Sequence, residues 1–120
     1  MIEKDFFIDT LKIMPENSIC YLQAPNLSSK LLLRVLQDSE YEYYLKIKLD
    51  NLNRKLLINC ILSENIQEDL QSIEIKKDDE LLFEGFDGVE YGTISNKLKL
   101  TEDYIKKYIN DDFCNISNDW

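Results

Sequence analysis

All three glycines of this 120-residue chain lie in one short segment, LLFEGFDGVEYGTI, at residues 81–94. At its centre, Asp87–Gly88 is a dipeptide typical of the two-residue turns that join antiparallel strands, because both residues tolerate a positive φ. The residues on each side are rich in aromatic and β-branched side chains, which are common in strands. The segment therefore predicts a β-hairpin, and no other feature of the sequence constrains the fold as strongly.

The predicted hairpin has two faces of different chemistry. A two-residue turn pairs Phe83 with Gly92 and Leu81 with Ile94, so the apolar side chains share one face and Gly92 leaves room for the ring of Phe83. The opposite face mixes aromatic, aliphatic and acidic side chains: Leu82, Glu84, Phe86, Val89, Tyr91 and Thr93. If a helix covers this second face it is core; if not, it is an aromatic and acidic patch of the kind found at protein interfaces.

The remaining segments predict one α+β domain over residues 1–120. An N-terminal helix is expected over residues 2–14, a short middle helix is expected to begin at Ser63, and Thr101 is expected to cap a C-terminal helix. Further strands are expected at residues 18–24, 30–37, 41–49 and 54–62, and a brief segment, SIEIKK at 72–77, precedes the hairpin.

The short connections between these segments favour one curved antiparallel sheet with helices covering one face and no parallel βαβ units. The last residues, NDDFCNISNDW at 110–120, are expected to form a polar tail. Three apolar side chains in this tail are candidate docking points: Phe113, Ile116 and Trp120.

The chain has a formal net charge of −9, and all of it belongs to the second half. Residues 1–62 contain eight acidic and eight basic side chains, whereas residues 63–120 contain fifteen acidic and six basic ones. Such a surface attracts cations or a basic protein and repels nucleic acid and anionic lipid. A solvated acidic surface that serves solubility is the alternative interpretation.

The sequence lacks the residue patterns of common catalytic and cofactor sites. It contains no histidine, which removes the commonest general base and the commonest zinc ligand. The spacing of the glycines does not match a dinucleotide or phosphate loop. We therefore expect no enzymatic activity, no cofactor and no metal site.

The three cysteines, Cys20, Cys60 and Cys114, are not clustered, and their odd number favours buried thiols in a reducing compartment over a disulfide framework. The first residues are charged throughout, unlike a signal peptide, and no apolar run is long enough to span a membrane. The sequence therefore predicts a cytoplasmic protein.

The acidic half and the hairpin supply the predicted partner-binding residues. They combine carboxylates, which steer a basic partner, with one aromatic anchor. These residues are Glu84, Asp87, Glu90, Tyr91, Asp78, Asp79, Asp111 and Asp112.

The run LFEGFDGVEYGTIS at residues 82–95, followed by LTEDYIKKYI at 100–109, resembles the C-terminal half of bacterial immunity proteins from contact-dependent growth inhibition and related polymorphic toxin systems. The resemblance implies a cognate toxin domain, often a nuclease, that is neutralised in a 1:1 complex by occlusion of its active site. A nuclease has a basic cleft for phosphates, which an acidic inhibitor can occupy as a phosphate mimic after long-range attraction. The resemblance identifies no toxin-contacting residue in this chain.

Two other functions fit an acidic chain of this kind. A nucleic-acid mimic, such as an anti-restriction protein, would present regularly spaced carboxylate pairs along an elongated surface. An adaptor that binds another basic protein would need no particular carboxylate pattern.

Overall fold

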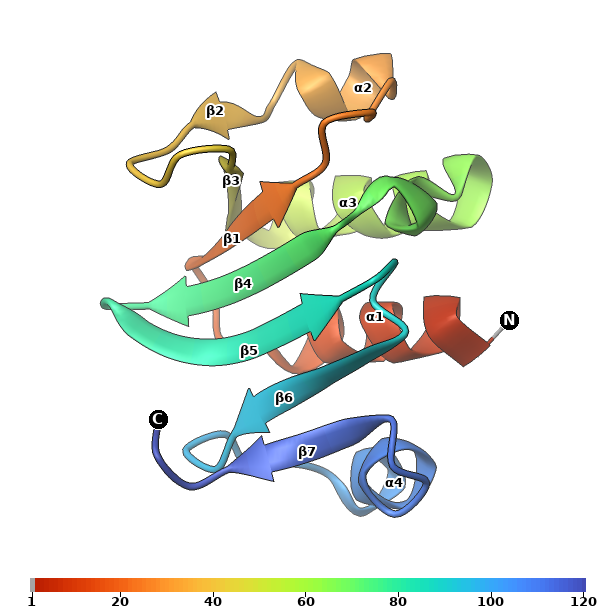
Figure 1. Cartoon of the computed structure of the whole chain (residues 1–120), viewed down its shortest axis with the longest axis vertical. Helices are drawn as coiled ribbons and strands as arrows, with labels where there is room; N and C mark the ends of the chain where they lie inside the picture. The colour runs from red at the N-terminus through yellow and green to blue at the C-terminus, as the bar shows by residue number, and fades with distance from the viewer. Residues whose placement is uncertain (1) are drawn as a thin grey trace.

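A seven-stranded sheet organises the fold in the computed structural model, which describes residues 2–120 (Figure 1). The strands lie in the order β2-β3-β1-β4-β5-β6-β7, and every neighbouring pair is antiparallel except β6 and β7. Their bounds are β1 Ser18–Gln23, β2 Gln37–Asp38, β3 Leu45–Leu49, β4 Ser72–Lys77, β5 Glu80–Phe86, β6 Tyr91–Ser95 and β7 Cys114–Ser117.

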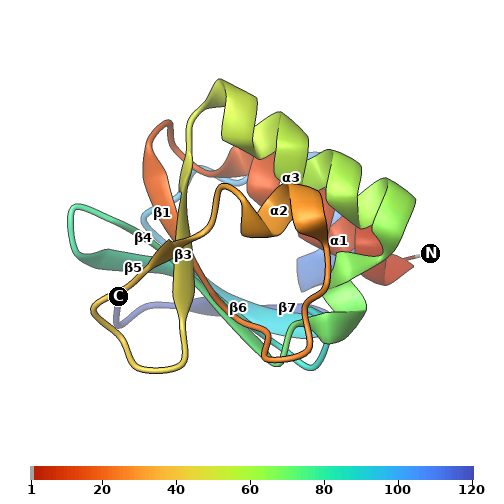
Figure 2. The same cartoon turned by 90° about the horizontal axis from the view of Figure 1, so that it is seen from above.

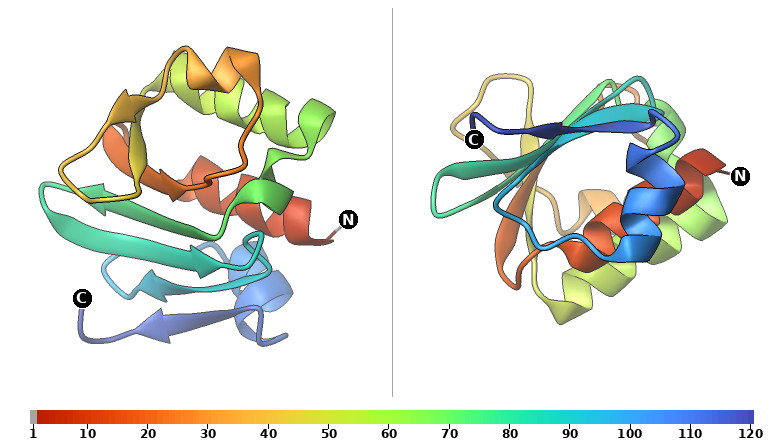
Figure 3. Two further views of the ribbon diagram at one scale, coloured as in Figure 1. Left: turned by 45° about the horizontal axis from the view of Figure 1, so that its top comes forward. Right: turned by 90° about the horizontal axis from the view of Figure 1, so that it is seen from below.

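The helices pack on one face of this sheet, which curves around them (Figures 2 and 3). They are α1 Ile2–Ile13, α2 Lys30–Leu33, α3 Asn51–Glu64 and α4 Glu102–Tyr104, and α4 continues as a single π-helical turn over Ile105–Ile109. A 3₁₀ turn, Ile66–Asp69, follows α3. The predicted fold class is confirmed: an α+β domain with N-terminal, middle and C-terminal helices on a mostly antiparallel sheet. Within residues 2–120, no helix is long and apolar enough to cross a membrane.

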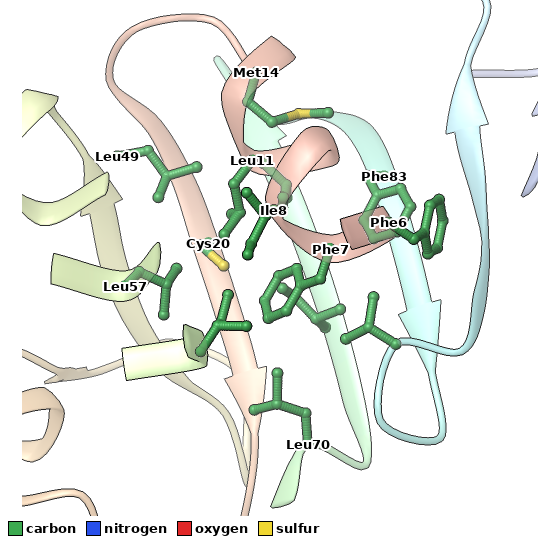
Figure 4. Packing of buried hydrophobic residues seen from close by; sticks show 14 of the residues in the cluster. Phe6, Phe7, Ile8, Leu11, Met14, Cys20, Leu49, Leu57, Leu70 and Phe83 are labelled. Atoms are coloured by element: carbon green, nitrogen blue, oxygen red, sulfur yellow. The ribbon is translucent and has the colours of Figure 1, made fainter. Parts of the chain in front are cut away.

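The core fills the layer between the helices and the sheet (Figure 4). Helix α1 contributes Phe6, Phe7 and Leu11, all fully buried, at the helical spacing that the sequence showed. The ring of Phe6 contacts Phe83 of β5 edge-on, with ring centroids 5.8 Å apart, and lies 5.1 Å from the ring of Tyr108. Burying each such aromatic side chain contributes about 1.5–3 kcal/mol, so this cluster holds α1 and the C-terminal helix against the hairpin.

Several predicted elements are confirmed at nearly the predicted bounds: the N-terminal helix, the strand at 18–24, and the helix after Thr101. The brief segment at 72–77 is strand β4. The side chain of Thr101 accepts a hydrogen bond from the Tyr104 amide at 3.1 Å, as expected of an N-cap. The expected burial of the thiols is also confirmed, because all three cysteines are buried and unbonded to one another.

Two predicted strands in the first half are wrong in whole or in part. Residues 30–37 form α2 and then the short β2, because the Ser29 side chain accepts from the Leu32 amide at 3.3 Å and starts a helical turn. Of residues 41–49, only Leu45–Leu49 are in a strand. Residues 41–44 form a turn, closed by a hydrogen bond from the Tyr44 amide to the Tyr41 carbonyl oxygen at 3.2 Å.

The predicted turn at 50–53 and central strand at 54–62 are wrong, because both belong to α3. The Asp50 side chain accepts from the Asn53 amide at 2.8 Å, so the acidic residue read as a turn is an N-cap. Burial follows helical spacing, with Leu57, Cys60 and Ile61 facing the core. Ser63 lies inside α3 rather than before a helix, and Asn65, at φ 54°, ends α3.

The hairpin exists, but its predicted pairing is wrong. Residues 87–90 form a four-residue connection, so Phe83 pairs with Ile94, Gly85 with Gly92, and Phe86 with Tyr91. Two residues assigned to the mixed face, Leu82 and Val89, are buried in the core. A bulge where β4 meets β5 changes the pairing near Leu81, and the turn carries the Val89 side chain inward.

The C-terminal segment is also more ordered than expected. Residues 114–117 form β7, which runs parallel to β6, so the chain does contain one parallel pair joined through a helix. Of the candidate docking points, Phe113 is half-buried against the core, and the Trp120 carbonyl oxygen accepts from the Ser95 hydroxyl at 2.5 Å. Ile116 is 39% exposed.

Candidate partner-binding surface

The outer face of the hairpin is free of helices, because α1, α3 and α4 all lie on the other side of the sheet (Figures 2 and 3). Cross-strand pairing aligns Gln23, Ser72, Phe86 and Tyr91 in one row across β1, β4, β5 and β6. The rings of Phe86 and Tyr91 lie 5.7 Å apart, and Tyr91 is 48% exposed. The aromatic and acidic face of the hairpin is therefore an accessible surface rather than core.

Acidic side chains border this row at the hairpin tip. The Tyr91 hydroxyl donates to the Asp87 carboxylate at 3.2 Å, and the negative charge of Asp87 raises the pKa of Tyr91. The tip is tied to the start of β4, because the Gly88 amide donates to the Leu70 carbonyl oxygen at 2.8 Å. A hollow of about 400 Å³ lies between the tip and the 3₁₀ turn, and it is lined in part by the carboxylates of Glu68, Asp87 and Glu90.

Gln67, next to this hollow, is 2% exposed. Among the residues that the structure describes, its side-chain nitrogen and oxygen have no hydrogen-bond partner. A buried amide without partners costs about 1–3 kcal/mol. The 3₁₀ turn that positions the acidic hollow is therefore held in place despite an unfavourable polar group.

Two carboxylates face each other in the next row of the same sheet face. Glu74 of β4 pairs directly with Glu84 of β5. Burial and then the charge of Glu74 raise the pKa of Glu84, and Lys76 partly offsets this effect. Glu74 is itself 3.8 Å from the Lys76 ammonium group. Because both carboxylates stand on an open sheet face, water reaches them, and the arrangement suits contact with a cation better than acid–base chemistry on an enclosed substrate.

The structure brings some of the predicted site residues together and separates others. Glu84, Asp87, Glu90 and Tyr91 lie at one end of the hairpin. Asp111 and Asp112 lie near the same end, because the Gly92 amide donates to the Phe113 carbonyl oxygen at 3.1 Å. Asp78 and Asp79 form the β4–β5 turn at the opposite end of these strands. In the part of the chain from residue 2 onward, none of the seven predicted carboxylates forms an ion pair.

Two tyrosines of the 41–44 turn, Tyr41 and Tyr44, belong to the same surface and were not among the predicted site residues. The Tyr44 hydroxyl donates to the Ser72 hydroxyl at 2.9 Å, which places the 41–44 turn beside the row of Phe86 and Tyr91. The ring of Tyr41 packs edge-on against Tyr21 of β1 at 4.9 Å. The signal was the YEYY run at 41–44, whose alternation was interpreted as part of a strand.

Comparison with known proteins adds nothing to this description: no protein-family model matches the chain, and no curated protein or solved structure matches it either. Within the described chain, no group of three or more cysteine, aspartate or glutamate side chains is arranged to hold a metal ion.

Proposed function

We propose that this protein is an immunity-type inhibitor that binds a basic toxin domain and occludes its active site. The observation that carries the proposal is the accessible row of Phe86 and Tyr91, bordered by the unpaired carboxylates of Glu84, Asp87 and Glu90. Aromatic side chains at the centre and charges at the rim are the usual composition of a specific interface. The resemblance of the hairpin and the last helix to immunity proteins suggests the class of partner.

The charges favour a basic partner because none of these carboxylates forms an ion pair within residues 2–120. Carboxylates that already form ion pairs contribute little to an outside partner, whereas unpaired ones retain their full attraction. Clustered charge of one sign also accelerates association, and this acceleration falls steeply as salt is added. A toxin with a cleft for nucleic-acid phosphates would present the complementary charge.

A nucleic-acid mimic is supported less well by the shape of the molecule. The described residues extend over 36 × 31 × 24 Å, which is not an elongated surface. The unpaired carboxylates also fall at two ends of the β4–β5 pair rather than in a continuous series. An adaptor would share the acidic surface but would not need to cover a partner's active site.

The test is the association rate with a candidate toxin domain, sought first among the genes that neighbour the one for this chain. Both Glu68 and Glu90 are exposed and border the hollow, so Glu68→Lys together with Glu90→Lys reverses the local charge without disturbing the core. We expect the association rate to fall about tenfold or more at low salt, and the wild-type rate to fall as salt is raised.

The matched control makes the same change in net charge elsewhere, with Asp5→Lys on α1 and Asp119→Lys near the C-terminus. Both side chains are exposed and lie outside the proposed surface. The control should slow association much less than the double change at the hollow. Equal effects of the two double variants, or an association rate independent of salt, would refute the role of this surface.

A further inference from the structure

A second hollow lies at the other end of the row that contains Phe86 and Tyr91. It has a volume of about 450 Å³, and the turn at residues 38–45 forms most of its wall. Gln23, the first residue of the row, also lines it, so the two hollows flank one continuous sheet face. Its volume falls in the range of sites that hold small ligands or single side chains of a partner.

The lining has the chemistry of a cation site. It contains three tyrosines, Tyr41, Tyr43 and Tyr44, and two carboxylates, Asp38 and Glu42, but no lysine or arginine. Aromatic ring faces attract cations through their quadrupole, and carboxylates add charge-assisted hydrogen bonds. The two carboxylates would repel an anion.

One ring of this group already binds a cation within the chain. The Lys76 ammonium group lies 4.3 Å from the centroid of the Tyr41 ring and donates to its hydroxyl at 2.9 Å. The ring of Tyr43 has neither an aromatic nor a cationic partner among the residues described, and the side chain is 77% exposed. The ring of Tyr44 also lacks such a partner, but Tyr44 is half-buried and its hydroxyl bonds Ser72, so Tyr43 is the most accessible ring for a cation from outside.

The backbone holds Tyr43 in an unusual position. Its φ is 72°, in the left-handed region that bulky residues rarely adopt. Ser39 stabilises the turn, since its hydroxyl accepts from the Tyr41 amide at 3.1 Å and donates to the Tyr44 carbonyl oxygen at 2.6 Å. Glycine is the usual residue at such a position in a turn, so an exposed tyrosine here is unfavourable for folding alone and points to a role at the surface.

We propose that this hollow, called the tyrosine pocket, receives an arginine side chain of the basic partner. A guanidinium group is planar, so it can stack on a tyrosine ring and at the same time donate two parallel hydrogen bonds to a carboxylate. A lysine ammonium group is not planar and cannot make both contacts in this way. The inference rests on the proposed function for the source of the arginine, but the pocket's preference for a guanidinium group is a property of this chain and is measured without the partner.

The experiment titrates the protein with N-acetyl-arginine methylamide and follows the backbone amide resonances by NMR. The neutral, nearly isosteric N-acetyl-citrulline methylamide is the control probe. We expect shift changes confined to the tyrosine pocket and at least about fivefold weaker binding of the citrulline compound. Equal shifts from the two compounds, or shifts centred on the hairpin tip, would overturn the proposal.

Substitutions in the pocket distinguish loss of the Tyr43 ring from loss of the folded structure. Tyr43→Gly removes the ring and suits the positive φ, so the protein should remain folded while arginine binding weakens about two- to fivefold. Glu42→Gln should weaken it by a similar factor through the loss of charge, whereas Tyr43→Phe keeps the ring and should bind as the wild type does. Tyr91→Ala removes an exposed tyrosine outside the pocket and should have no effect. If Tyr43→Gly bound arginine as tightly as the wild type, the pocket would not be the site.

Failure here is distinguishable from failure of the proposed function. If the arginine compound does not bind in the pocket while toxin association still depends on salt and on Glu68 and Glu90, only the pocket is refuted. If the compound binds in the pocket but the hairpin charges have no effect on toxin association, the proposed function is refuted and the cation site stands.

Discussion

Replacing Gly92 with alanine tests the packing that fixes the accessible face of the hairpin. A Cβ atom added at Gly92 would lie 2.7 Å from two carbons of the Phe83 ring and 2.5 Å from the Glu84 carbonyl oxygen. Gly85, which pairs with Gly92, is crowded by the same ring, with 2.9 Å from an added Cβ atom to Phe83. The Phe83 ring thus lies over a pair of glycines, and any side chain at Gly92 displaces it.

The expected cost is about 2–3 kcal/mol, toward the upper end for overpacking in a core. The Phe83 ring has little room to rotate away from the new methyl group, because it is fully buried against Phe6. The Glu84 oxygen belongs to the backbone of the paired strand, so it can move only if the strand moves. For a domain of this size, this cost should lower Tm by roughly 4 °C per kcal/mol. It is a large part of the roughly 5–15 kcal/mol by which such domains are stable.

Urea denaturation followed by far-ultraviolet circular dichroism measures this cost as a lower midpoint with an unchanged slope. Thr93→Ala, one residue further on the open face, is the control and should cost less than about 1 kcal/mol. Adding Phe83→Leu to Gly92→Ala should cost about 0.5–1 kcal/mol less than the sum of the two single changes, because the smaller side chain relieves part of the contact. A cost below about 0.5 kcal/mol for Gly92→Ala would show that the ring does not lie over the glycine pair.

Three further predictions concern single polar groups. Gln67→Met should raise the free energy of unfolding by about 1 kcal/mol, because it replaces an unpartnered buried amide by an apolar side chain of similar length; thermal denaturation measures this. Glu84→Gln should stabilise the protein by about 0.5 kcal/mol at pH 7. Because the folded-state pKa of Glu84 is raised, its ionised form is the unfavourable one, so the gain should disappear below about pH 4 in denaturation curves recorded across pH. Thr101→Ala should cost about 1 kcal/mol through the loss of the N-cap, whereas Thr101→Ser should be nearly neutral in the same assay.

The sequence predicted elements well where hydrophobic periodicity and end signals agreed. At residues 2–14 the apolar spacing and Pro15 indicated the same helix, and the structure confirms it. At residues 54–62 the run is apolar from Leu56 to Leu62 except at Asn59, so periodicity could not distinguish a buried helix from a central strand. The deciding signal is local: an aspartate at position 50 fits a turn and a helix N-cap equally well, and in the structure its side chain caps α3.

The candidate surface was predictable only in part, because it depends on pairing and on long-range packing. The face with Glu84, Phe86 and Tyr91 follows from strand alternation alone, and these three residues do lie on one side. The burial of Val89 does not follow from alternation, because it depends on whether the connection between β5 and β6 has two residues or four. The contribution of Tyr44 was hidden for a different reason: the contact with Ser72 joins segments far apart in the sequence.

The strand order has a consequence for how the chain acquires its structure during synthesis. The interior strand β1 has β3 on one side and β4 on the other, and β4 comes about fifty residues later in the chain. At typical ribosomal speeds, roughly 3–10 s pass between the synthesis of these two partners. During that interval one edge of β1 lacks its hydrogen-bonding neighbour, and such an edge can pair with another chain. The acidic half of the protein supplies the strand that closes this edge, so truncation before residue 72 should yield an aggregation-prone fragment rather than a smaller domain.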